Sequence, residues 1–176
     1  MSISLMEVLQ RLKALDEKDG YGTAARRKVD LDSEISSVEL TYPVTAGLLR
    51  EATVGALSLI AEEQLVISPR RTVELAVLVS LVVLEETERC GDPAVLQYPP
   101  LTDEAVGAHF RRCAMEIARH PFTFPDDLIL PAGVVVDIGP RVLELIAKDG
   151  LVLSAQQEAE LLVAVVMDCY AEMKDG

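Results

Sequence analysis

The sequence predicts a mainly α-helical protein with a small β element, built as an internally duplicated domain whose pseudo-twofold halves surround two buried apolar helices. Half of the 176 residues are hydrophobic, yet only 4% are aromatic and none is Trp. The core must therefore consist mainly of Leu, Val, Ile and Ala. Long segments of these residues that follow a capping residue favour packed helices.

An internal repeat predicts the duplication. Residues 57–88 align with residues 143–174 at a constant offset of 86 and without a gap, and twelve of the 32 aligned positions are identical. Self-similarity at a fixed spacing identifies the building block of a fold. We therefore expect one domain, residues 1–176, made of two similar halves at about 1–95 and 100–176.

Each half is expected to open with an amphipathic helix, over about Ser4–Lys18 in the first half and Thr102–Arg119 in the second. Apolar residues recur at helical spacing in both segments. Thr102 and the two acidic residues after it suit the positive end of a helix dipole. The apolar face of the second helix consists of Val106, Phe110, Cys113, Ala114 and Ile117.

A short strand is expected after each opening helix. Val38, Leu40 and Tyr42 alternate with polar residues before Pro43, a pattern typical of a strand with one buried face. In the second half, residues 128–137 hold β-branched residues between proline and glycine. If the two strands pair with each other, they tie the halves together.

The repeated segments predict two helical hairpins. The first helix of each hairpin covers roughly Ala46–Glu63 and Pro140–Lys148, and the second covers Pro69–Glu88 and Ala155–Lys174. Both second helices follow a serine that can cap them. In the first half the serine precedes a proline, whose missing N–H costs nothing at a helix start. In the second half it opens a capping box with the glutamine three residues later.

Both second helices are apolar nearly all round, through Leu75–Leu84 in one and Leu161–Met167 in the other. A helix without a polar face must be surrounded by other elements. We expect the two helices to pack together near a pseudo-twofold axis within one chain. The alternative is a homo-oligomer in which they meet between chains.

Charge and cysteine usage narrow the class of partner and the location. The net charge of −13 disfavours direct binding to nucleic acids or to anionic membranes and favours a protein partner with a basic surface. The apolar run Leu75–Leu84 is half of the ~20 residues that a membrane span needs. The N-terminus lacks the layout of a secretory signal. Three cysteines without paired spacing fit a reducing cytosol, so we expect a cytoplasmic protein.

One helix carries the strongest chemical constellation, His109, Cys113, Glu116 and His120. Steps of four, three and four residues place these side chains along one line of the helix, and their atoms are plausible zinc ligands. His109 and His120 lie about 16 Å apart, so only adjacent members could chelate one ion and a second element would have to complete the shell. The competing interpretation assigns Cys113 to the apolar face and places His109, Glu116 and His120 along its border.

The compact basic cluster Arg26, Arg27 and Lys28 follows a loop with two glycines and is a candidate phosphate site. It lacks the spacing of a nucleotide-binding P-loop, and a solvated linker is the favoured interpretation.

Three function classes remain open. The first is a non-enzymatic interaction module, such as an adaptor, regulator or inhibitor, that needs no cofactor and engages a basic partner through its acidic surface. The second is a zinc-dependent sensor or enzyme centred on His109, Cys113, Glu116 and His120. The third is an acidic mimic of nucleic acid that blocks a DNA-binding protein.

Overall fold

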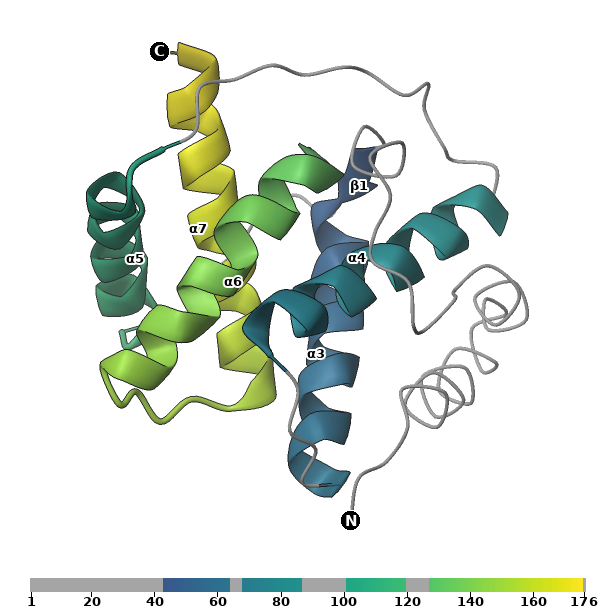
Figure 1. The fold of residues 1–176 in the computed structure, drawn as a ribbon, viewed down its shortest axis with the longest axis horizontal. Helices are drawn as coiled ribbons and strands as arrows, with labels where there is room; N and C mark the ends of the chain where they lie inside the picture. The colour runs from purple at the N-terminus through teal and green to yellow at the C-terminus, as the bar shows by residue number, and fades with distance from the viewer. Residues whose placement is uncertain (1–42, 64–67, 87–100, 120–126, 176) are drawn as a thin grey trace.

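The computed structural model describes residues 43–63, 68–86, 101–119 and 127–175, and most of these residues are helical (Figure 1). The predicted class, mainly α with a small β element, is therefore confirmed. The opening helix predicted over Ser4–Lys18 and the connector between the halves lie outside the described residues. The elements are, in chain order, β1 (Pro43–Thr45), α3 (Ala46–Glu63), α4 (Pro69–Glu86), α5 (Asp103–Ile117), β2 (Ile129–Pro131), α6 (Ala132–Lys148) and α7 (Ala155–Asp175).

The two strands pair in antiparallel orientation, with Val44 opposite Leu130. The sequence had left open whether such strands pair. Both of these side chains are fully buried, so the small sheet is anchored in the core. The alternating residues 38–42, on which the first strand was predicted, lie outside the described residues. The second strand is shorter than its predicted segment, because it ends at Pro131 and the following valines are helical.

The prediction that helix α6 begins at Pro140 is wrong. It begins eight residues earlier, at Ala132, and Pro140 lies inside it. A proline inside a helix removes one backbone hydrogen bond and crowds the carbonyl one turn earlier. Here packing outweighs that cost, because Val134, Val135 and Val136 are buried on the helix. The offset of 86 pointed to this start, since α3 begins at Ala46.

The two serine caps form as predicted. The amide of Arg71 donates to Ser68 Oγ at 3.2 Å, and α4 begins at Pro69. In the second half the amide of Gln157 donates to Ser154 Oγ at 3.1 Å, while Gln157 Oε1 accepts from the amide of Ser154 at 3.0 Å. These reciprocal bonds satisfy amide groups that have no partner inside the helix.

The two apolar helices, α4 and α7, are each covered by helices from both halves of the chain. Helix α4 packs mainly on α3 and α6, and α7 packs on α3, α5 and α6 (Figure 1). The sequence predicted direct packing of α4 on α7, but this is not a principal contact among the described elements. The first helix of each hairpin instead covers the second helix of the other. The offset of 86 also relates the starts of β1, α3 and α4 to those of β2, α6 and α7.

All seven elements contribute to one cluster of buried apolar side chains. Its largest fully buried members include Phe110 on α5, Leu49 on α3, Ile138 on α6 and Leu161 on α7. Buried polar groups are satisfied locally. Glu74, for example, accepts from Arg70 Nε and from Arg71 Nη1, both at 3.0 Å. None of the described helices combines the length and the apolar character that crossing a bilayer requires.

The contact between α4 and α6 leads to a stability prediction. A Cβ atom on Gly139 would lie 2.9 Å from Val73 Cγ1, closer than packed carbon atoms approach. We expect Gly139→Ala to lower the free energy of unfolding by about 1–3 kcal/mol, because the overpacking outweighs the gain in helix propensity. Chemical denaturation followed by circular dichroism measures this change.

Two further variants test the cause. Val73→Ala leaves a cavity in the wild-type background but makes room for the methyl group that Gly139→Ala adds, so the double variant should lose less stability than the two single losses combined. Gly107→Ala on α5 is the matched control, because its Cβ would meet only the flexible end of Arg111 at 3.4 Å. Equal destabilisation by Gly107→Ala would show that the α4–α6 contact is not the cause.

Candidate functional site

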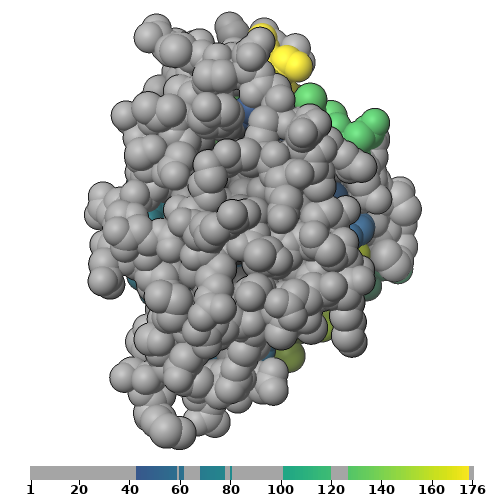
Figure 2. Space-filling model, turned by 90° about the vertical axis from the view of Figure 1, so that its right-hand side faces the viewer, coloured from purple at the N-terminus to yellow at the C-terminus, as the bar shows by residue number. Residues whose placement is uncertain are grey.

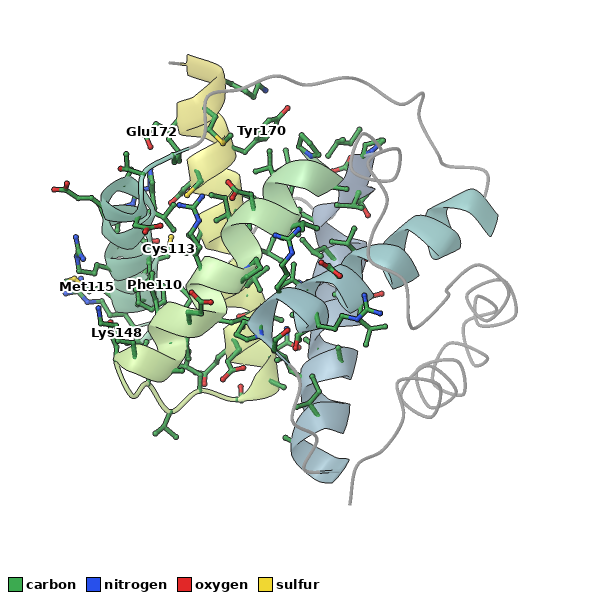
Figure 3. All side chains as sticks on the ribbon, in the orientation of Figure 1. Phe110, Cys113, Met115, Lys148, Tyr170 and Glu172 are labelled. Carbon is green, nitrogen blue, oxygen red and sulfur yellow. The ribbon has the colours of Figure 1, made fainter. Side chains whose placement is uncertain are left out.

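The candidate site lies where α5 packs against α7. Helix α5 begins after Thr102, whose Oγ1 accepts a hydrogen bond from the amide of Ala105 at 3.2 Å. Its buried face, which includes Val106, Phe110 and Ile117, follows the predicted pattern and contacts α6 and α7. Figure 3 shows Cys113 on the side of α5 that faces α7. The polar residues beside this apolar face are thereby brought to the second helix.

A chain of hydrogen bonds joins the two helices. The thiol of Cys113 donates to Asp168 Oδ2 at 3.2 Å, and Arg112 Nη2 donates to the same carboxylate oxygen. Arg112 Nη2 also lies 3.2 Å from His109 Nδ1, and His109 Nε2 lies 2.9 Å from Glu172 Oε2. Because guanidinium only donates, Nδ1 must accept, and this pattern assigns the ring proton to Nε2. His109 then donates to Glu172.

The site extends from the core to the surface. Cys113 is buried, the side chain of His109 is 17% exposed, and that of Glu172 is 50% exposed. Figure 2 shows the C-terminal end of α7, in yellow, at the surface of the molecule. The Arg112–Asp168 ion pair is partly exposed, so solvent screens it and its contribution to stability is small. The chain of polar groups is therefore accessible from one end.

Burial is the main influence on the pKa of the Cys113 thiol. Burial first, and then the hydrogen bond to Asp168, raise the pKa of Cys113 to about 12. The hydrogen bond from Arg112 to Asp168 raises the pKa of the guanidinium. Cys113 is consequently protonated at neutral pH, and a protonated thiol is a poor nucleophile. The thiol of Cys113 donates to Asp168, while His109 contacts Arg112 and Glu172, so the two side chains have separate hydrogen-bond partners.

The structure separates the four residues of the predicted zinc site, His109, Cys113, Glu116 and His120. His109 and Cys113 both reach α7, whereas Glu116 is exposed on α5 and His120 lies outside the described residues. Within the described ranges, no three His, Cys, Asp or Glu side chains are already grouped to hold a metal ion. Zinc binding by these four residues stays a prediction. The candidate phosphate residues Arg26, Arg27 and Lys28 also lie outside the described residues.

Three residues of the site were not predicted from the sequence: Arg112, Asp168 and Glu172. One signal for Asp168 was available, because it interrupts the apolar surface of α7 where the aligned residue of the first repeat is Val82. Glu172 follows one helical turn later, on the same face. Nothing in the sequence, however, indicated that this face of α7 meets α5.

A second polar cluster, centred on Arg141, has a structural role. Its Nη1 donates to the carbonyl oxygen of Leu101 at 3.0 Å and to Asp103 at 3.1 Å, while its Nη2 donates to Asp137 at 2.8 Å. These bonds attach the start of α5 to α6. Arg141 thus fixes the position from which α5 runs along α7.

Comparison with known proteins adds no function to this geometry. No protein-family model, no curated protein and no solved structure matches the chain. The chemistry of the described residues must therefore carry the functional argument.

The buried thiol of Cys169 on α7 leads to a pH prediction. Burial raises its pKa from 9.0 to about 12. The folded protein therefore keeps the proton to a higher pH than the unfolded chain does, and stability falls as the pH rises from about 9 towards 12. Between pH 8 and pH 10 we expect this thiol to cost roughly 1 kcal/mol of unfolding free energy.

Urea denaturation at the two pH values measures the loss. Cys169→Ala should lower the unfolding free energy at pH 8, because it leaves a small cavity. When the pH is raised from 8 to 10, however, the unfolding free energy of the variant should fall less than that of the wild type. Equal losses in the wild type and in the variant would contradict the assignment of a raised pKa to Cys169.

Proposed function

We propose that the protein is a non-enzymatic interaction module that acts in the cytoplasm and binds a protein partner with a basic surface. The observation that carries this proposal is the excess of acidic over basic side chains. The described ranges contain 18 Asp and Glu residues but only nine Lys and Arg residues. Acidic side chains are thus in excess on the scaffold itself, and an excess of this sign attracts basic partners over long distances.

Ion pairs within the molecule leave this excess of acidic charge unchanged, but they occupy several of the arginines. Arg70 and Arg71 both pair with the buried Glu74. Arg112 pairs with Asp168, and Arg141 pairs with Asp103 and Asp137. More than half of the described arginines are therefore engaged within the molecule. Exposed carboxylates such as Glu104, Glu144 and Asp149 form no hydrogen-bonded ion pair within the part of the chain that the structure describes.

The turn between α6 and α7 offers the best place for a partner. Gly150 adopts a left-handed conformation with φ of 65°, and its amide donates to the carbonyl of Ala147 at 3.2 Å. The chain then exposes Leu151 and, above all, Val152, whose surface is 97% exposed. An exposed apolar pair separated from Asp149 by only Gly150 fits a partner that combines basic and apolar side chains.

We also infer that the scaffold is an internally duplicated unit with a pseudo-twofold arrangement. The repeat in the sequence and the common offset of the element starts support this inference. The strand register supports it as well. Val44 and Leu130, which are 86 positions apart, face each other at the centre of the antiparallel pair, as a twofold axis between two copies requires. Residues that differ between the copies are then the natural places for a specific function.

The proposal predicts a charge-dependent partner. A crosslinking pull-down from the native cell with the full chain should recover a basic protein. Recovery should fall about tenfold for the double variant Glu144→Gln/Asp149→Asn, and it should also fall at high salt, because exposed charges are then screened. Quantitative mass spectrometry of the captured protein measures both effects.

The control removes the same charge elsewhere. Glu51→Gln/Asp127→Asn neutralises two exposed acids outside the α6–α7 turn and should leave recovery close to the wild-type level. Equal losses in both double variants would remove the turn from the proposal. A capture that yields no basic protein, together with a turnover assay that finds an activity, would overturn the proposed function. Competition by DNA would identify the partner as a DNA-binding protein.

A further inference from the structure

The outer side of helix α5 carries three exposed residues, Arg111, Met115 and Arg119, which we call the α5 stripe. They follow one another at intervals of four residues, so they lie on the same side of the helix. Met115 is 61% exposed, and Figure 3 shows it on the side of α5 that faces away from α7. The stripe is therefore opposite the buried face of the helix.

The α5 stripe is basic, although the protein as a whole is acidic. Arg112 and Arg141 are engaged in ion pairs with neighbouring acids. The guanidinium groups of Arg111 and Arg119, by contrast, form no ion pair within the part of the chain that the structure describes. An exposed methionine between these two cations fits a partner surface that offers carboxylates together with apolar side chains.

The turn between α6 and α7 has this complementary chemistry. Glu144 and Asp149 are exposed acids, and Val152 is an exposed apolar residue shortly after them. The exposed charges beside the two surfaces are opposite as well, because Glu116 lies beside the α5 stripe and Lys148 lies in the turn. Each sign of charge on one surface thus has its counterpart on the other.

Exposed apolar side chains also concentrate on these two surfaces. Five large hydrophobic residues are exposed in the described ranges, and Met115, Leu151 and Val152 are three of them. Contiguous exposed apolar groups mark sites of protein contact. Helices α5 and α6 pack on each other, and Figure 3 shows Met115 and Lys148 at the same edge of the molecule. The α5 stripe and the turn can therefore take part in one interface.

We propose that the α5 stripe of one chain binds the α6–α7 turn of a second copy of this chain, and that the reverse contact closes a twofold dimer. The arginines of the stripe then face the acids of the turn, and Met115 packs on Val152. An interface to which each copy contributes both surfaces is self-complementary, so it closes at two copies. This inference rests on the docking turn of the proposed function and names one partner for it.

The net charge of −13 does not prevent this contact. At physiological ionic strength, exposed charges that lie more than about 8 Å apart are largely screened from each other. Repulsion between two copies is therefore limited to charges near the interface, where the stripe and the turn have opposite signs. Local complementarity decides which surfaces meet.

Self-association regulates the proposed function in this arrangement. One turn cannot hold a second copy and an outside partner at the same time, so the two binding events compete. The dimer keeps the turn covered, and a basic partner that binds the turn more tightly separates the two copies. The monomer is then the form that binds the outside partner.

The test is analytical ultracentrifugation of the full chain at physiological ionic strength, over concentrations of about 1–100 µM. We expect a monomer–dimer equilibrium in this range. Arg111→Glu/Arg119→Glu and Glu144→Arg/Asp149→Arg should each weaken self-association by about tenfold or more, because like charges then meet. An equimolar mixture of the two variants should restore the dimer, because both contacts again join opposite charges.

The control is Glu51→Arg/Asp127→Arg, which makes the same change of net charge as the turn variant at exposed acids outside both surfaces. It should self-associate at least as strongly as the wild type. Circular dichroism verifies that each variant is folded. A wild type that stays monomeric throughout the range would overturn the inference, and so would a mixture of the two interface variants that stays monomeric.

The stripe variant Arg111→Glu/Arg119→Glu separates this inference from the proposed function, because it leaves the turn intact. Loss of the dimer with undiminished recovery of a basic partner in the crosslinking pull-down supports the inference. Recovery of a basic partner by a wild type that never dimerises overturns the inference alone. A dimer that the mixture experiment confirms, without recovery of any basic partner, overturns the outside partner of the proposed function alone.

Discussion

Two helices without a polar face, α4 and α7, impose the main constraint on this structure. Each must be covered on several sides, because exposed Val and Leu side chains would forfeit the hydrophobic contribution that drives folding. Helices α3 and α6 provide this cover by packing on both apolar helices. The β1–β2 pair holds the starts of α3 and α6 together, since each strand leads directly into one of these helices. The close approach of Gly139 to Val73 results from the same crosswise packing.

Helix α5 packs on α6 and α7, and its position there creates the candidate site. One face of α5 is apolar and completes the cover of α7, while Arg141 attaches its start to α6. The polar residues at the border of that face then meet α7. Burial of Cys113 and its bond to Asp168 produce a protonated thiol within a polar chain that reaches the surface. The same packing that stabilises the fold therefore sets the chemistry of the site.

The proposed function concerns one part of the surface. The acidic excess and the exposed Val152 concern the turn between α6 and α7, where a partner can dock.

The sequence alone determined the elements that depend on local chemistry. Serine caps, helical spacing and the offset of 86 located α3, α4, α5 and α7, because these signals act within a few residues of the chain. The start of α6 was misplaced, since a proline breaks helices locally unless burial of the preceding valines outweighs its cost. Only the tertiary structure decided which faces meet. The crosswise cover of α4 and α7, and the approach of Asp168 to Cys113, join residues that are far apart in sequence, and spacing along one chain carries no information about such contacts.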